Sequence, residues 1–167
     1  MITYDESVVL AGKLRQASPA ILGVELFGSV QKNGEGRDAD FIILVDNELA
    51  RQWWTKEREL IRVRWPDALY EQRWIIKKFI PFIYSTYVHK RRQQRLKNSA
   101  DMLGIDLKSL ANQKGEVPDF ELFLFPINWR MGQELNLSLM HKMTDLVNDK
   151  NTLGFLERIA RDAVAIN

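Results

Sequence analysis

Leu26-Phe-Gly-Ser-Val-Gln-Lys-Asn-Gly-Glu-Gly-Arg-Asp-Ala-Asp-Phe-Ile-Ile-Leu-Val45 is the stretch that decides the fold of this chain, because it places two aspartates at the start of an apolar run. In an extended strand side chains alternate between faces, so Asp38 and Asp40 point the same way, with their Cα atoms roughly 6.6 Å apart. Two carboxylates this close repel each other and lose solvation unless a cation or a basic side chain compensates them. Magnesium prefers carboxylate oxygens and shares its coordination sphere with substrate phosphates. The stretch therefore predicts a site for phosphate and metal chemistry.

Gly28 and Ser29 close the first apolar run and supply groups that suit a phosphate. Glycine lets the backbone approach a ligand without a Cβ, and backbone N–H groups together with the Ser29 hydroxyl can hold phosphate oxygens. The alternative is a plain hairpin, in which the glycine-bearing residues 33–36 form the turn and Asp38 bonds its own backbone. That alternative explains the glycines but gives no role to Ser29 or Asp40.

This arrangement, Gly-Ser followed by eight residues and Asp-x-Asp, resembles the signature of the DNA polymerase β-like nucleotidyltransferase superfamily. The resemblance covers residues 21–46 best, and the spacer of residues 30–37 is at the short end for the family. The resemblance implies an α+β fold with a small mixed β-sheet of the nucleotidyltransferase type, flanked by helices. Additional helices are expected in the middle of the chain and at its C-terminus.

The family also carries a third carboxylate on a later strand, and three residues are candidates for it. Glu121 is the first choice, because it lies between apolar residues in the alternating stretch 118–126. Asp119 is predicted to share its face and is the alternative. Glu71 is the third candidate, because it lies nearer in sequence to where compact family members place this residue.

The resemblance implies a magnesium-dependent nucleotidyltransferase that moves a nucleoside monophosphate from a nucleoside triphosphate such as ATP to a hydroxyl acceptor and releases pyrophosphate. Asp38, Asp40 and Glu121 would be the catalytic and metal-binding residues, with two Mg²⁺ ions, and Gly28 and Ser29 would bind the β and γ phosphates. The alternative is a catalytically inactive member of the same fold that binds a nucleotide, a nucleic acid or a protein partner.

Basic residues suggest further contacts. Lys32 and Arg37, between the two motifs, are candidate phosphate ligands, with a solvated turn as the alternative. Residues 51–97 carry thirteen Lys or Arg against four acids, although the whole chain has a net charge of only +2. Residues 87–97 are predicted to form a basic helix that would suit a nucleic-acid backbone, whereas charged helix faces are usually only solvated. Its basic residues are Lys90, Arg91, Arg92, Arg95 and Lys97.

Composition limits the remaining classes. The 167-residue chain has no cysteine, which excludes disulfides, thiolate catalysis and a cysteine zinc site. It has no run of about 18 apolar residues and begins with polar residues, so we expect no membrane segment, no secretory signal and a cytoplasmic location. We expect one domain over residues 1–128 with a helical insertion at about 72–112, and C-terminal helices over 129–167 packed on the same domain.

The patterns predict helices and strands along the whole chain. The helices are residues 5–16 with Asp5 as the cap, 46–64 capped by Asp46 or Asn47, 71–97, 99–111, 129–148 and 152–164. The strands are residues 21–27, 38–45, 118–126 and a short candidate at 67–71.

Overall fold

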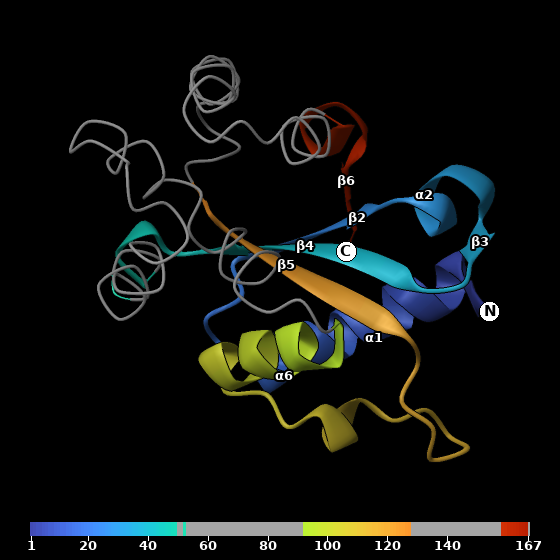
Figure 1. The fold of residues 1–167 in the computed structure, drawn as a ribbon, viewed down its shortest axis with the longest axis horizontal. Helices are drawn as coiled ribbons and strands as arrows, with labels where there is room; N and C mark the ends of the chain where they lie inside the picture. The colour runs from blue at the N-terminus through green and yellow to red at the C-terminus, as the bar shows by residue number, and fades with distance from the viewer. Residues whose placement is uncertain (50–51, 53–91, 128–157, 167) are drawn as a thin grey trace.

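The computed structural model describes residues 1–49, 52, 92–127 and 158–166, which form an α+β fold around a small mixed sheet (Figure 1). The α+β class expected from the sequence is confirmed. The predicted strand 67–71, the predicted helix 129–148 and Glu71 lie outside the described residues.

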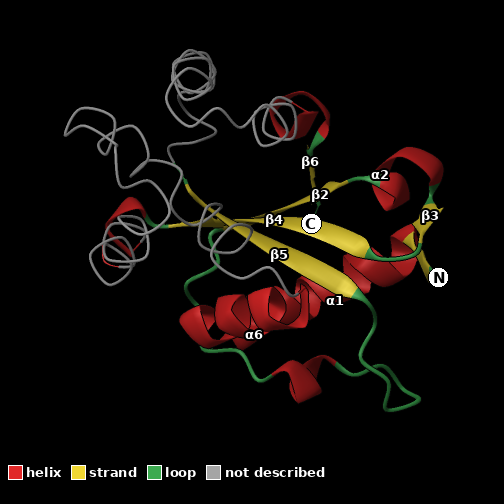
Figure 2. Ribbon diagram, in the orientation of Figure 1, coloured by secondary structure: helices red, strands yellow, loops and turns green. Residues whose placement is uncertain are grey.

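Helices and strands are interspersed along the described part of the chain (Figure 2). The helices are α1 (Tyr4–Ala17), α2 (Ser29–Asn33), α6 (Arg92–Leu103) and a short 3-10 helix, η2 (Leu107–Leu110). The strands are β1 (Ile2–Thr3), β2 (Gly23–Phe27), β3 (Glu35–Gly36), β4 (Ala39–Val45), β5 (Phe120–Pro126) and β6 (Val164–Ala165). The three main predicted strands are thus confirmed as β2, β4 and β5, each within two residues of its expected bounds.

Residues 47–49 and 158–162 are helical as well. Asp46 Oδ2 accepts a hydrogen bond from Glu48 N (2.8 Å), which confirms Asp46 as the cap of the first of them. Among the helices of the described residues, none combines the length and the apolar character needed to cross a lipid bilayer.

β4 is a central strand of the main sheet, whose order is β5-β4-β2-β6. It runs antiparallel to β2, with Phe27 opposite Asp40, and parallel to β5, with Asp40 beside Glu121. β6 pairs antiparallel with β2, and β1 and β3 form a separate two-stranded ladder. Because parallel strands cannot be joined by a tight turn, the chain leaves the sheet after β4 and passes through α6 and η2 before it returns as β5.

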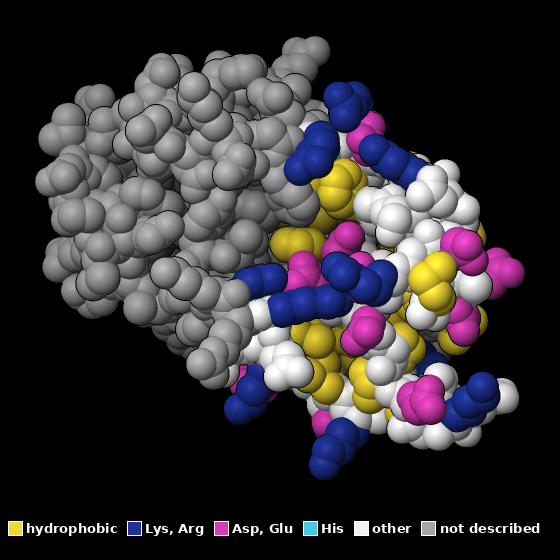
Figure 3. Space-filling view, turned by 45° about the vertical axis from the view of Figure 1, so that its right-hand side comes forward, with side chains coloured by type: hydrophobic (Ala, Val, Ile, Leu, Met, Phe, Trp, Pro, Cys, Tyr) yellow, Lys and Arg dark blue, Asp and Glu magenta, His cyan; other side chains and the backbone are white. Residues whose placement is uncertain are grey.

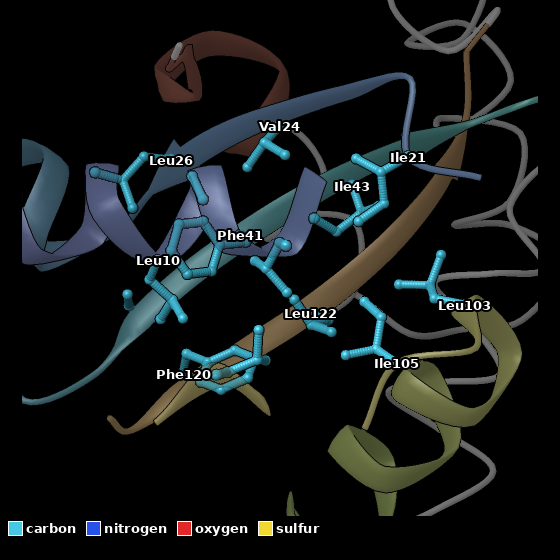
Figure 4. Packing of buried hydrophobic residues seen from close by; sticks show 14 of the residues in the cluster. Leu10, Ile21, Val24, Leu26, Phe41, Ile43, Leu103, Ile105, Phe120 and Leu122 are labelled. Carbon is cyan, nitrogen blue, oxygen red and sulfur yellow. The ribbon is translucent and has the colours of Figure 1, made fainter. Parts of the chain in front are cut away.

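One face of the sheet packs against α1 and α6. Side chains alternate along β4 and β5, so Phe41 shares a face with Phe120 and Leu122. The rings of Phe41 and Phe120 meet edge to face with their centroids 6.3 Å apart. Figure 4 shows this cluster completed by Leu10 of α1 and Leu103 of α6. Apolar residues on the opposite face are buried as well, among them Ile42, Phe123 and Phe125.

The start of α1 differs from the prediction that Asp5 caps it. Thr3 is the N-cap, and its hydroxyl accepts from Glu6 N (3.3 Å) while the Glu6 carboxylate accepts from Thr3 N (2.7 Å). This reciprocal pair is a capping box, which satisfies two backbone donors at once and therefore takes precedence over a cap at Asp5. The helix ends before Ser18, as expected, and Ser18 Oγ donates to Leu103 O (2.6 Å), which ties α1 to the end of α6.

Three other predicted elements are corrected. Residues 33–36 form no tight hairpin turn, because α2 runs to residue 33 and Gly34 ends it with a φ of 80°. α6 runs past the expected helix end at Lys97 to Leu103, where Gly104 with a φ of 71° stops it, and η2 takes the place of the later part of the helix predicted over 99–111. Residues 164–165 form β6 instead of the end of a helix, because they pair with the free edge of β2.

The Ile166→Ala variant is expected to lower the free energy of unfolding by about 2–4 kcal/mol, because it deletes a buried side chain. Ile166 is 3% exposed, and its N–H donates to Val24 O (3.0 Å). The matched control is Val164→Ala: Val164 is 48% exposed, and its truncation is expected to change stability by less than about 0.5 kcal/mol. Chemical denaturation measures both variants. Equally small losses would show that the C-terminal segment contributes little to the core.

Candidate functional site

The ends of β2 and β4 bring the two sequence motifs together. Phe27 pairs with Asp40, so Gly28 follows directly beside the Asp40 side chain. Gly28 has a φ of 87° and a ψ of −154°, a backbone region that essentially only glycine adopts. A Cβ at this position would lie 2.6 Å from Asp40 Oδ2. Two observations therefore require a glycine at position 28: the backbone conformation and the space that the Asp40 carboxylate occupies.

Ser29 begins α2 and lies against Gly36 of β3. A Cβ on Gly36 would overlap Ser29 Oγ and would come within 2.9 Å of Val30 Cγ2. The absence of a side chain at Gly36 thus lets the loop fold back over the start of α2. The structure places Gly28 and Ser29 at the same end of the sheet as Asp38 and Asp40, as the two motifs predicted.

The parallel pairing of β4 and β5 brings one candidate for the third carboxylate beside Asp40. Glu121 lies opposite Asp40 in the register and is partly buried. Asp119 precedes β5, is exposed, and contributes its backbone carbonyl, which accepts from Ala39 N (3.1 Å). The choice of Glu121 over Asp119 as the third carboxylate stays a prediction.

The pKa of Asp40 is raised by its burial and by the two acids beside it, Asp38 and Glu121. Burial raises the pKa of the Asp40 carboxyl from 3.8 to about 7, and the negative charges of Asp38 and Glu121 add to the effect. Arg92 opposes the rise in pKa. A carboxyl with this pKa has a strong electrostatic reason to bind either a proton or a cation.

Two arginines of α6 supply positive charge to the site (Figure 3 shows basic side chains lying against acidic ones on this side of the molecule). Arg92 Nη2 lies 2.8 Å from Asp38 Oδ2, and Arg92 Nε lies 3.3 Å from Glu121 Oε1. Arg95 Nη2 lies 2.8 Å from the same Glu121 oxygen. One guanidinium therefore bridges carboxylates from two neighbouring strands, and a second one reinforces the bond to Glu121.

These two arginines were missed as site residues by the sequence reasoning, which placed them on a basic helix over 87–97 facing a nucleic acid. Residues 87–91 lie outside the described residues, and Lys97 is exposed. The spacing of Arg92 and Arg95, three residues apart on a helix, does put them on one face. Sequence alone, however, gave no signal that this face lies over the acidic residues, because the position of the helix depends on the long connection between β4 and β5.

The two basic residues of the loop take other positions. Lys32 Nζ lies 3.4 Å from Asp162 Oδ2, so it faces the C-terminal helical segment. Hydrogen bonds from Arg161 and then from Lys32 lower the pKa of Asp162 to about 2. Arg37 is exposed. A role for Lys32 or Arg37 in holding phosphate stays a prediction.

The acidic residues suit a magnesium ion in their chemistry but not in their present arrangement. Asp38, Asp40 and Glu121 offer the carboxylate oxygens that Mg²⁺ prefers. Within the described residues, however, no group of three acidic or histidine side chains is arranged to hold a metal ion. The guanidinium of Arg92 instead pairs with one oxygen of Asp38 and one oxygen of Glu121.

No family model, curated protein or solved structure matches this chain. The resemblance of residues 21–46 to the nucleotidyltransferase signature therefore stays a prediction.

The stability of the metal-free protein is expected to fall as the pH rises from about 5 to 8. The folded-state pKa of Asp40 is about 7, above the ordinary 3.8, so the folded state binds the proton more tightly. The proton on Asp40 contributes at most about 4 kcal/mol to the free energy of unfolding. This contribution is complete below about pH 4 and is lost as the pH rises through 7. Urea denaturation in EDTA at pH 5, 6, 7 and 8 measures it.

The Asp40→Asn variant is expected to remove this pH dependence and to be more stable than the wild type at pH 8. The control is Asp101→Asn, at an exposed position on α6, which keeps the wild-type slope. Comparison of the two variants cancels the contribution of other titrating groups. A slope that is the same in all three proteins would contradict the raised pKa of Asp40.

The Gly28→Ala variant is expected to destabilise the protein more than Gly34→Ala does, by about 2 kcal/mol. Both glycines have positive φ values, of 87° and 80°, so both variants introduce backbone strain. Only at position 28 does the new Cβ meet a neighbour, since nothing lies within 4 Å of one at Gly34. Denaturation curves of the two variants give the difference in their free energies of unfolding. Equal losses of stability in the two variants would show that the Asp40 side chain moves aside without a cost in free energy.

Proposed function

We propose that this protein is a nucleotidyltransferase, which transfers a nucleoside monophosphate from a nucleoside triphosphate to a hydroxyl acceptor and releases pyrophosphate. The observation that carries the proposal is the juxtaposition of Asp40 with the backbone of Gly28 on one side and with Glu121 of the parallel strand on the other. The carboxylates and the phosphate-binding backbone that this chemistry needs come from three neighbouring strand ends. Such a reaction depends on positioning and charge neutralisation and needs no covalent nucleophile.

Each group of residues would have a separate role in the reaction, which follows from its chemistry. Asp38, Asp40 and Glu121 would hold Mg²⁺ ions, which neutralise the charge of a triphosphate when bound. Gly28 lets the backbone come close to the β and γ phosphates, and the Ser29 hydroxyl can donate to them. Glu121 would lie beside the acceptor hydroxyl and favour its deprotonation.

A specific observation supports a second candidate function. Because Arg92 and Arg95 already neutralise Asp38 and Glu121, the carboxylates have partners without any metal ion. An inactive nucleotidyltransferase fold that binds a nucleotide, a nucleic acid or a protein partner would show such internal pairing. The two functions differ in whether a nucleoside triphosphate and magnesium are used together.

Calorimetric titration of each nucleoside triphosphate, with and without Mg²⁺, tests the proposal. The wild type is expected to bind at least one nucleotide only when Mg²⁺ is present, and Asp38→Ala/Asp40→Ala is expected to lose this binding. Asp101→Asn controls for the loss of a negative charge outside the site. Binding that is equal with and without Mg²⁺, or unchanged in the double variant, would favour the non-catalytic alternative.

Glu121→Gln and Asp119→Asn form a matched pair for the third carboxylate. Once an acceptor has been found with nucleotide labelled at the α-phosphorus, transfer of the label is expected to fall by at least about 100-fold in Glu121→Gln. Asp119→Asn is expected to keep most of the transfer, because the Asp119 side chain is exposed and the residue lies just before the start of β5. The reverse order would assign the role to Asp119.

A further inference from the structure

Asp38 and Glu121 come from different strands and contact the same guanidinium. Asp38 directly precedes β4, and Glu121 is the second residue of β5. Arg92 Nη2 lies 2.8 Å from Asp38 Oδ2, and Arg92 Nε lies 3.3 Å from Glu121 Oε1. A guanidinium is planar and its donors are rigidly placed, so the positions of Nε and Nη2 constrain the distance between the two acids. The Arg92 side chain therefore acts as a spacer between the two strand ends.

We propose that Arg92 is a positioning residue, which sets the relative placement of the Asp38 and Glu121 carboxylates through the two donors of its guanidinium and not through its charge alone. The inference rests on the proposed function only in treating these two acids as functional groups of the site. The arrangement itself can be measured on the protein without a nucleotide or a metal ion.

The ion pairs with α6 use only one oxygen of each carboxylate. Arg92 contacts Oδ2 of Asp38, and both Arg92 and Arg95 contact Oε1 of Glu121. Oδ1 of Asp38 and Oε2 of Glu121 take no part in these ion pairs. Because an ionised carboxylate accepts through both of its oxygens, the arginines can orient the two acids while each acid keeps one oxygen for a ligand of the site. This division of the oxygens suits a positioning role.

Arg92 can serve as a fixed spacer because α6 is held by other contacts. At the end of the helix, Ser18 Oγ donates to Leu103 O over 2.6 Å, and this hydrogen bond is buried. One turn after Arg92, Arg95 Nη2 donates to Glu121 Oε1 over 2.8 Å. The backbone that carries Arg92 is thus placed by neighbouring residues, and the guanidinium then determines where the two acids lie.

Arg92→Lys and Arg92→Gln separate the role of the two donors from that of the charge. Lysine keeps the positive charge, but its single ammonium nitrogen cannot reproduce the two donor positions of the guanidinium. If only the charge matters, Arg92→Lys behaves like the wild type. If the two donors matter, as we propose, Arg92→Lys resembles Arg92→Gln. Lys97→Gln is the matched control, because it removes a positive charge from an exposed position of the same helix.

Carboxyl ¹³C NMR of the full chain in EDTA is the first measurement. The signals of Asp38 Cγ and Glu121 Cδ are identified by their absence in Asp38→Asn and Glu121→Gln. Arg92→Gln is expected to shift both signals, Arg92→Lys at least one of them, and Lys97→Gln neither. Wild-type positions of both signals in Arg92→Lys would overturn the proposal.

The methyl signals of Leu103 report whether α6 keeps its place in the same samples. They are expected to stay at their wild-type positions in Arg92→Lys and Arg92→Gln, because the end of the helix is held by Ser18. A shift of the Leu103 signals as large as that of the carboxyl signals would show that Arg92 holds the whole helix on the sheet. That result would also overturn the proposal.

Double-mutant cycles by urea denaturation give a second readout. The cycles combine Arg92→Lys with Asp38→Asn and with Glu121→Gln. For at least one of the two acids, the coupling is expected to change the unfolding equilibrium constant by about threefold, a value typical of partly exposed ion pairs. No measurable coupling at either acid would contradict a role for the two donors.

The outcomes are independent of nucleotide transfer. Shifted carboxyl signals in Arg92→Lys, together with no nucleotide binding by the wild type, would support the positioning role and count against the transferase. Unshifted signals, together with magnesium-dependent nucleotide binding by the wild type, would overturn the positioning role and support the transferase.

Discussion

The parallel pairing of β4 with β5 is the constraint on which the candidate site depends. Its register places Asp40 beside Glu121, although the two residues are 81 positions apart in the sequence. A slip of one residue would turn Glu121 into the core and bring an apolar neighbour beside Asp40, because side chains alternate with a period of two. The buried residues of both strands prevent such a slip, since Phe41, Phe120 and Leu122 all face α1 and α6. The packing of one face thus fixes the chemistry of the other.

The same pairing of β4 with β5 brings negative charges close together, and their repulsion must be compensated. Three carboxylates meet where burial already raises the pKa of Asp40 to about 7. Like charges in a poorly solvated position require a proton, a basic side chain or a metal ion. In this structure Arg92 and Arg95 neutralise Asp38 and Glu121. The pairing with α6 thus supplies the positive charge that two of the three acids require.

The sequence predicted those features that depend on local pattern. Alternation and apolar runs located β2, β4 and β5, and the same alternation placed Asp119 and Glu121 on one face. The roles of Arg92 and Arg95 were not predictable, because a helix within a long connection can lie over either face of a sheet. β6 was missed because two residues carry too little pattern, and its existence depends on the free edge of β2. The cap of α1 was misassigned because Asp5 looked sufficient alone, whereas the reciprocal bonds of Thr3 and Glu6 satisfy more backbone groups.

The three carboxylates are held in different ways. Asp40 is confined by the backbone of Gly28 and by its place within β4, so the fold itself fixes its position. Asp38 and Glu121 are instead held by guanidinium groups of α6. A side chain fixed by the fold is preorganised, while side chains fixed by ion pairs can exchange partners. The position of Asp40 therefore follows from the sheet, whereas the positions of Asp38 and Glu121 also depend on how α6 lies against its edge.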